Sequence, residues 1–307
     1  MRPATIGTGG ACVTARGYPW PPGADGSRPE WTGSAFRVSG REVRVMTYTA
    51  GSSGWSDGLT QLHEESAGGD HPIDRMSRDW AVAALRRHNR HDAPTLLEIG
   101  CSSGFLLRRL KTDFPQATVI GSDFLKDPLD RLAAHLTGIP LLQFDAVRCP
   151  LPDESIDATI LLNVLEHIGH DLDAMRQVAR ILRPGGIAVV EVPAGPHLYD
   201  AYDEHLQHYR RYSASSLRSL LASAGLTIVD QSHLGVFAYP GFIAVKRRNQ
   251  RFLNAADSDV RRQLVETEIR QTRGSRLLRG VLRVEAWLGR FVSFPFGIRC
   301  VAVGRKP

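Results

Sequence analysis

Three acidic residues in this chain each follow an apolar run and could together bind one ligand. Glu98 ends the first run, Asp123 ends the second, and Asp145 follows the third. Ligands of parallel α/β sheets lie outside the carboxyl ends of the strands, so we expect the three carboxylates to converge there. A carboxylate in the first turn would repel a pyrophosphate but can accept hydrogen bonds from an ammonium group or a ribose. This chemistry favours S-adenosylmethionine (SAM) over a dinucleotide.

A turn of small residues, Gly100 to Gly104, follows Glu98 and leads into a segment with helical periodicity. Small residues at a strand–turn–helix junction let the backbone approach a nucleotide-like ligand closely. Asp123 lies 19 residues after Gly104, where a carboxylate can accept both ribose hydroxyls, and Asp145 could accept from an adenine amino group. Each feature alone is often only a tight turn or a helix cap. Their order and spacing together favour a ligand.

Two histidines could remove a proton from an acceptor. His167 follows the fourth expected strand, and an ordinary pKa of about 6.5 suits a general base. The alternative is that His167 only packs against or caps the next helix. A second cluster follows the fifth strand and offers His208 as another base. Candidate acceptor-binding residues in that cluster are Tyr199, Tyr202, Asp203, Tyr209, Arg211 and Tyr212. The alternative there is that Arg210 and Arg211 pair with Asp203 and Glu204 to stabilise the loop.

Alternating strands and helices must position these residues. Apolar strands separated by amphipathic helices predict an α/β fold with a doubly wound, mostly parallel, seven-stranded Rossmann-like sheet. A helical insertion is expected before the last strand. The expected strands are 95–99, 118–121, 141–144, 158–163, 187–192, 226–232 and 298–303, and the helices are 73–88, 104–113, 127–136, 171–183 and 213–225. A short strand is also expected over 41–48.

Composition divides the chain into five parts. Residues 1–40 are rich in Gly, Pro, Thr and Ser and predict a flexible tail in which Trp20 or Trp31 could dock. The other expected parts are an N-terminal cap or helical segment at 41–92, a SAM-binding core at 93–235, an insertion at 236–296 serving as lid or interface, and the last strand at 297–307.

The positive charge of the chain is local. The net charge is +6, but residues 245–290 hold 12 Lys and Arg against 5 Asp and Glu, a balance of +7, so the remainder is near neutral. The insertion could therefore cover the sheet edge, form a homodimer, or meet a membrane or an amphiphilic substrate. The basic charge also raises nucleic acid as a partner, but no stripe of interleaved aromatic and basic residues supports that interpretation.

The four cysteines are scattered and form no C-x-x-C pair, so we expect reduced thiols. No run of about 18 uncharged apolar residues suggests a spanning helix, and the first residues lack the apolar core of a secretory signal. These features predict a cytoplasmic protein.

Taken together, the motifs resemble those of the class I SAM-dependent methyltransferases of the type 11/12 kind. The resemblance covers about residues 70–232 and rests on segments 96–104, 119–123, 144–146, 150–157, 161–168 and 181–186. It implies that the turn residues Glu98, Gly100, Ser102 and Gly104 face the methionine moiety and that Asp123 binds the ribose. Asp145 and Ala146 would bind the adenine, Asn163 would lie beneath the cofactor, and Phe124 is also expected to contact the cofactor. Ser102 stands where the family usually has glycine.

The resemblance implies methyl transfer from SAM to a small-molecule acceptor, on O, N or C, with secondary metabolism as one setting and S-adenosylhomocysteine as product. The alternatives are a nucleic-acid methyltransferase and a non-catalytic SAM-binding scaffold. Asn163-Val164-Leu165-Glu166-His167 differs from the Pro-Pro-aromatic pattern of enzymes that methylate base amines. Some relatives bind a metal through Glu-x-x-Glu-His and a distant His. The first carboxylate is missing here, so no metal is expected, although Glu166, His167 and His208 could hold one.

Overall fold

The large sheet confirms the predicted α/β class. The computed structural model describes residues 15–23, 25–49, 71–253 and 276–307. Its large sheet has the order β10-β11-β9-β8-β5-β6-β7-β4. Among these described strands β11 runs in the opposite direction to the others, so its pairings with β10 and β9 are antiparallel and the remaining pairings are parallel. The strands are β4 (Val45–Thr47), β5 (Thr95–Ile99), β6 (Thr118–Asp123), β7 (Leu141–Gln143), β8 (Ile156–Leu162), β9 (Leu182–Pro193), β10 (Thr227–Leu234) and β11 (Arg299–Arg305).

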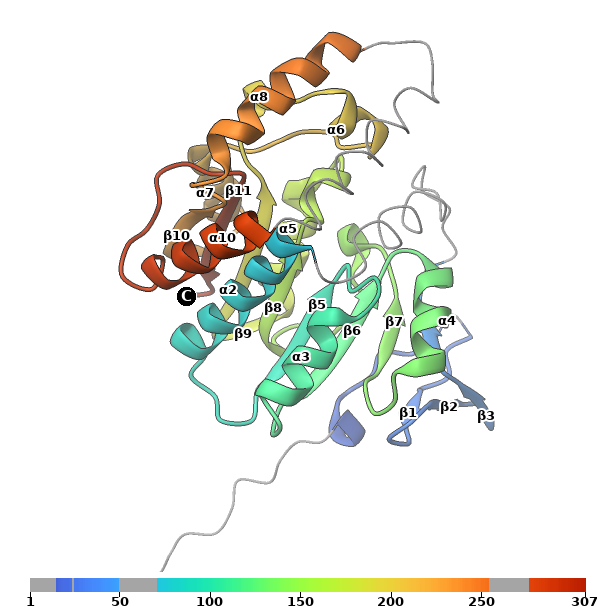
Figure 1. Cartoon of the computed structure of the whole chain (residues 1–307). Coiled ribbons are helices and arrows are strands. Elements are labelled where there is room, and N and C mark those ends of the chain that lie inside the picture. Colours follow the sequence, from blue (N-terminus) through green and yellow to red (C-terminus); the bar gives the residue numbers. More distant parts are fainter. Residues whose placement is uncertain (1–14, 24, 50–70, 254–275) are drawn as a thin grey trace, which may run out of the picture.

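Helices cover both faces of this sheet, because successive strand residues point to opposite faces. Leu96 of β5 packs in a core with α2 (Pro72–His88), α3 (Phe105–Asp113) and α4 (Lys126–His135). Its neighbour Leu97 packs in a second core with α5 (Asp171–Ile181) and α7 (Ala214–Ser223). Figure 1 shows α2 and α3 on the same face of the sheet. The sheet is therefore doubly wound, as predicted.

Residues 15–43 form structure where the sequence predicts a flexible tail up to residue 40. A short helical turn η1 (Ala15–Gly17) precedes a small antiparallel sheet of β1 (Glu30–Trp31), β2 (Phe36–Val38) and β3 (Arg41–Val43). Trp20 and Trp31 are buried, and each ring centroid lies 4.9 Å from that of Phe36. Burial of these rings on the sheet offsets the entropy cost of ordering a Gly- and Pro-rich segment. The first fourteen residues of the predicted tail lie outside the described residues.

The strand expected over 41–48 is divided between two sheets. The backbone leaves the small sheet after β3, and β4 pairs in parallel with β7 at the edge of the large sheet. The large sheet thus has eight strands instead of the predicted seven. The extra strand covers the edge that β7 would otherwise expose.

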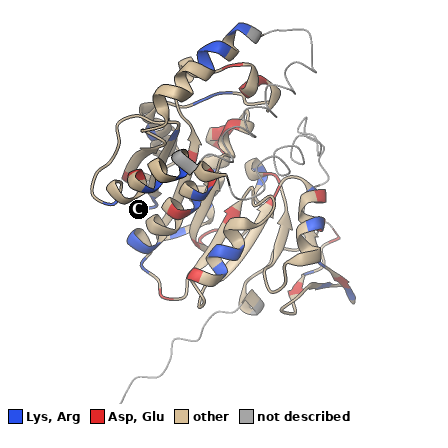
Figure 2. Cartoon of the chain, in the orientation of Figure 1, with Lys and Arg blue, Asp and Glu red and all other residues tan. Residues whose placement is uncertain are grey.

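The segment before the last strand contains helices, as predicted. They are α8 (Tyr239–Asn249), followed by the turn η5 (Gln250–Phe252), and α10 (Arg276–Leu288). Helix α10 packs against α2, and α8 packs near η4 (Pro196–Leu198) and contacts η5. Figure 2 shows Lys and Arg at the end of α8 and along α10. Among the described helices, none has the length and apolar character needed to cross a bilayer.

Candidate functional site

The three acidic residues lie at one edge of the sheet. β5, β6 and β7 are adjacent and parallel, so their carboxyl ends share that edge. Glu98 is in β5, Asp123 ends β6, and Asp145 follows β7 by two residues. The prediction that strand order would place these residues along one edge is confirmed by the backbone arrangement.

Glu98 is buried without enough hydrogen-bond donors. Glu98 is only 6% exposed, and its Oε2 accepts no hydrogen bond from the described residues. Burial, helped by the charge of Asp123, raises the pKa of Glu98 well above its usual value, while the charge of Arg78 on α2 opposes this rise. Buried polar atoms without partners are rare in folded proteins. A bound ammonium group would supply the missing donor, which fits SAM at this position.

Asp123 is oriented by the backbone. Its Oδ2 accepts a hydrogen bond from the N–H of Ser102 at 3.0 Å, and its Oδ1 accepts one from the N–H of Leu125 at 3.1 Å. Each carboxylate oxygen has more than one acceptor site, so both can still accept ribose hydroxyls. The Asp123 carboxylate therefore fits the expected ribose contact. It also connects the turn at Ser102 to the end of β6.

The other residues expected to contact the cofactor after β6 and β7 are held in the same way. Asp145 Oδ1 accepts from the N–H of Val147 at 3.0 Å and caps the turn η2 (Ala146–Arg148), which begins at the buried Ala146. The carbonyl of Phe124 accepts from the Gln143 side chain at 3.1 Å. Gln143 and Phe124 thus connect β7 to the loop after β6.

The first turn requires small residues. Gly100 has φ +77°, and a Cβ there would lie 2.5 Å from Cγ2 of Val164. Gly104 has φ +70°, and a Cβ there would lie 2.7 Å from Cδ1 of Leu132. Ser102 has φ 44°, in the left-handed region that favours glycine. The hydrogen bond from its N–H to Asp123 helps to hold this conformation, which explains how serine replaces the usual glycine.

Asn163 is anchored by residues that the sequence analysis did not include. It has φ 54°, and its side-chain amide donates to Oε1 of Glu191 at 3.0 Å. The same oxygen accepts from Arg299 at 2.8 Å. Glu191 is fully buried in β9, and Arg299 begins β11. A charged residue within an apolar strand was the available signal for Glu191, while Arg299 is more than 100 residues away in the sequence.

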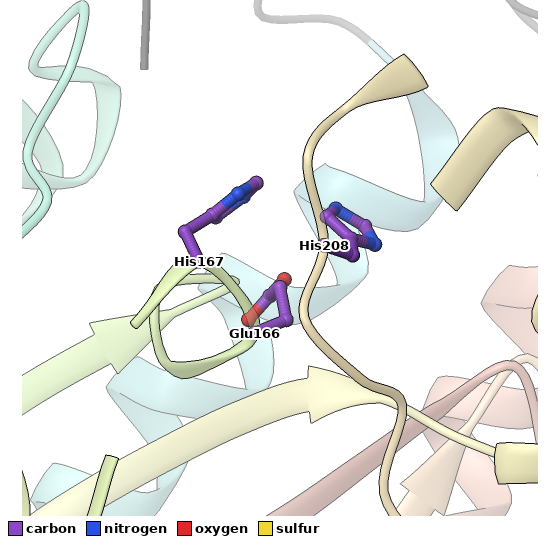
Figure 3. A group of neighbouring side chains, drawn as sticks. All are labelled: Glu166, His167 and His208. Carbon is purple, nitrogen blue, oxygen red and sulfur yellow. The ribbon is translucent and has the colours of Figure 1, made fainter. Parts of the chain in front are cut away.

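The two candidate bases lie together (Figure 3). His167 ends the turn η3 (Leu165–His167) after β8, and its ring centroid is 4.7 Å from that of His208. Val164, which packs on Gly100, immediately precedes this turn. The histidine pair therefore lies next to the small-residue turn, although His167 and His208 are 41 residues apart in sequence.

His208 is oriented by a buried carboxylate. Its Nδ1 is 2.8 Å from Oδ1 of Asp203. Burial lowers the pKa of His208, and the Asp203 carboxylate only partly offsets this effect. At neutral pH the imidazole is uncharged, so Nδ1–H donates to Asp203 and Nε2 keeps a lone pair. This is the protonation state of a general base.

Asp203 belongs to a buried charged cluster of Asp200, Asp203, His208, Arg211 and Lys246. Arg211 donates to Oδ1 of Asp203 at 2.8 Å, and Lys246 donates to its Oδ2 at 2.9 Å and to Asp200 at 2.7 Å. Burial would raise the pKa of Asp203, but the His208 hydrogen bond and the two cations hold it far below its usual value. Burial raises the pKa of Asp200 to about 6. Lys246 of α8 therefore connects the insertion to the site, a contact that the sequence analysis missed.

Several residues expected to bind the acceptor are engaged within the protein. The Tyr199 hydroxyl donates to the carbonyl of His208 at 2.8 Å. The Tyr212 hydroxyl donates to the Asp171 carboxylate at 2.8 Å, and Arg211 also donates to the carbonyl of Ala194. Tyr212 and Arg211 are buried, so their contacts favour the loop-stabilising alternative.

The exact ion pairs differ from that alternative in one respect. Arg211 pairs with Asp203, as that alternative proposed. Arg210 pairs with Asp171 at 2.7 Å, and not with Glu204. Tyr209 is 66% exposed, and the Tyr202 ring lies 4.9 Å from Nζ of Lys246. Tyr209 is therefore the exposed tyrosine of the predicted acceptor group.

Glu166, His167 and His208 also form a group that could ligate a metal, with ligand atoms within 4.8 Å of one another. Burial raises the pKa of Glu166 to about 8, so its carboxyl group is mostly protonated at pH 7. The Asp203 carboxylate that pairs with His208 also pairs with Arg211 and Lys246, so two positive charges lie close to this group. A protonated carboxyl and nearby positive charge both disfavour a divalent cation.

Comparison with known proteins agrees with this geometry. Residues 97–190 match the model of a methyltransferase domain. A probable SAM-dependent methyltransferase of Mycolicibacterium smegmatis is 30% identical over 174 residues, 56% of this chain and 66% of that protein. The malonyl-[acyl-carrier protein] O-methyltransferase of Dechloromonas aromatica is 31% identical over 165 residues, 50% of this chain and 61% of that protein. The chain thus spans less than two thirds of the length of these relatives.

Solved structures show the same fold. Phosphoethanolamine N-methyltransferase 2 of Haemonchus contortus, solved with SAM, superposes with a TM-score of 0.52 at 15% identity, covering 84% of this chain and 61% of that chain. The matched residues 97–190 include the acidic strand ends, the small-residue turn and Asn163, which are residues predicted to bind the cofactor. Residues 97–190 therefore belong to the methyltransferase domain family, and the relatives that match this part of the chain are named SAM-dependent methyltransferases.

Proposed function

We propose that this protein transfers a methyl group from SAM to a small-molecule acceptor that loses a proton during the reaction. The observation that carries the proposal is the buried Glu98 oxygen that accepts no hydrogen bond from the described residues. It lies beside a turn whose Gly100 is close to Val164, and the carbonyl of Val164 accepts from the N–H of His167. Cofactor binding and proton removal would then occur at adjacent parts of one sheet edge.

The cofactor contacts follow from the groups at the edge. Glu98 would accept from the ammonium group of SAM, Asp123 from the ribose hydroxyls, and Asp145 with Ala146 would face the adenine. SAM supplies an electrophilic methyl group on sulfur. Transfer is an in-line displacement, so the protein mainly has to align the acceptor and remove its proton.

His167 is the proposed base that contacts the acceptor, because it is less buried than His208 and directly follows the fourth strand. His208 keeps a neutral ring beside it, held by Asp203, so no positive imidazole opposes proton uptake by His167. A hydroxyl is the simplest acceptor that needs this assistance, since its proton must leave as the methyl group arrives.

The test is methyl transfer from labelled SAM to the small-molecule fraction of a bacterial extract. We expect label in one or a few compounds, and we expect His167→Ala to lower the rate about a hundredfold while SAM affinity is unchanged. Full activity of His167→Ala would return this residue to the packing role. Label in RNA, or SAM binding without transfer to any component, would overturn the proposal in favour of the nucleic-acid or scaffold alternative.

A further inference from the structure

The outer surface of the insertion is unusually apolar. The described residues include nine large hydrophobic side chains that are exposed, and six of them lie between residues 236 and 296. The six are Phe237, Val284, Trp287, Phe291, Val292 and Phe296. We call these six residues the apolar patch. An exposed group of this kind usually marks an interaction surface.

Helix α10 explains how the patch arises, because it carries apolar residues on two faces. The inner face places Leu278 and Leu282 against Ile73 and Met76 of α2. The outer face presents Val284 and Trp287, at 55% and 56% exposure, and continues to Phe291 at 72%. An ordinary surface helix has polar residues opposite its packed face. The outer face of α10 therefore needs a partner that the rest of the described chain does not supply.

Aromatic contacts extend the patch beyond α10. The ring centroids of Trp287 and Phe291 are 5.6 Å apart. The ring centroid of Phe296 lies 5.4 Å from that of Tyr239, the first residue of α8. The same helix α8 carries Lys246 into the charged cluster around Asp203. The apolar patch and the candidate acceptor site are thus connected by one helix.

The charge around the patch is positive. Arg279, Arg283 and Arg290 are exposed along α10 and just after it. Glu285 is the acidic residue between them, and it is fully buried, where it accepts hydrogen bonds from the N–H groups of Gly235 and Phe237 at 2.6 and 3.1 Å. Because the Glu285 carboxylate is buried, the exposed charged side chains of residues 279–296 are all positive.

We propose that the apolar patch and its three arginines dock this protein on an anionic lipid surface. Aromatic and aliphatic side chains next to arginine are typical of segments that lie in the membrane interface. A symmetric interface between two copies would bring the same arginines close to one another, which disfavours that occupant. Nucleic acid would match the arginines but not the exposed Val284 and Val292. An anionic bilayer satisfies both the charge and the apolar side chains.

Vesicle flotation with the full chain tests the proposal. We expect binding to vesicles of phosphatidylcholine with about one third phosphatidylglycerol, and weak binding to phosphatidylcholine alone. The double variant Trp287→Ala, Phe291→Ala should bind at least about tenfold more weakly to the anionic vesicles. Arg279→Gln and Arg283→Gln should each weaken binding about fivefold and reduce its dependence on salt.

Matched substitutions control for general surface effects. Phe105→Ala removes a ring that is 43% exposed on α3, and Arg131→Gln removes an exposed arginine on α4. Both should leave vesicle binding unchanged, and melting curves should show that all variants are folded. Equal binding of wild type and the Trp287/Phe291 variant would overturn the proposal. So would lipid-independent self-association, or RNA binding, that depends on the same residues.

Discussion

The sheet edge that carries Glu98, Asp123 and Asp145, called the cofactor edge below because we propose that SAM binds there, differs from the charged cluster around Asp203 in how its acids are paired. At the cofactor edge, the groups come from consecutive strand ends, and Glu98 keeps an oxygen without a donor. In the cluster, the groups come from α6 (Ala201–His205), the following loop and α8, and Asp203 is paired with two cations and a histidine. In the first arrangement Glu98 Oε2 accepts no hydrogen bond from the described residues, whereas in the second both oxygens of Asp203 are paired within the protein and only Oδ2 of Asp200 lacks a partner among those residues.

This difference separates binding from positioning. An acid that lacks a donor in the protein can gain one from a ligand, so its removal should affect affinity first. An acid whose bonds are all internal holds other groups in place, so its removal should affect stability first. The predictions below test this division.

The largest expected effect is a loss of stability in Asp203→Ala. Removing this carboxylate leaves the buried Arg211 without a carboxylate partner and Lys246 with Asp200 alone, which should lower the free energy of unfolding by about 3–5 kcal/mol. Urea unfolding measures it. Asp153→Ala, which removes a 71% exposed partner of Arg180, is the control and should change stability by less than about 1 kcal/mol. Similar losses in both variants would contradict the positioning role of the cluster.

Glu166→Gln should remove a pH dependence of stability. The Glu166 carboxyl keeps its proton until about pH 8 in the folded protein but loses it near 4.5 when unfolded. The unfolded state therefore binds fewer protons between these values, so this residue makes the protein less stable as pH rises from 4.5 to 8, by up to about 4 kcal/mol. Urea unfolding at pH 5.5 and 8 should show a smaller fall for Glu166→Gln. The exposed Glu42→Gln should behave as wild type, and an unchanged slope in Glu166→Gln would exclude this residue as the source.

Asp123→Ala should weaken SAM binding about tenfold, equivalent to about 1.4 kcal/mol, because it removes the proposed acceptor of the ribose hydroxyls. Calorimetry measures the affinity, and thermal melting without SAM measures stability. Asp130→Ala removes an exposed carboxylate of α4 as control. Unchanged affinity in Asp123→Ala would disprove the ribose assignment, and a loss of stability alone would move Asp123 into the positioning class.

Removal of divalent cations should have the smallest effect. The raised pKa of Glu166 and the cations on Asp203 disfavour a metal at Glu166, His167 and His208. We therefore expect SAM affinity and methyl transfer to be the same with and without a chelator. A loss of transfer that added manganese or magnesium restores would show that this group holds a catalytic metal.

Local sequence was sufficient for the cofactor edge. Glu98, Asp123 and Asp145 were predictable because strand alternation and the small-residue turn are short-range patterns. The N-terminal segment was not predictable in this way, since its order depends on distant partners. The Tyr18 hydroxyl, for example, bonds Ser155 at 2.8 Å across 137 residues. Composition alone therefore predicted a tail where aromatic burial produces a packed segment.

The sequence by itself determined the fold class, the order of the acidic strand ends and the cofactor family, because each depends on periodicity or on residues close in the chain. Only the tertiary structure decided which groups complete the site. It placed Lys246 on Asp203 and Asp200, Glu191 on Asn163, and His208 beside His167. The physical reason is that a buried charge requires a partner in space, and the chain folds that partner in from any sequence distance.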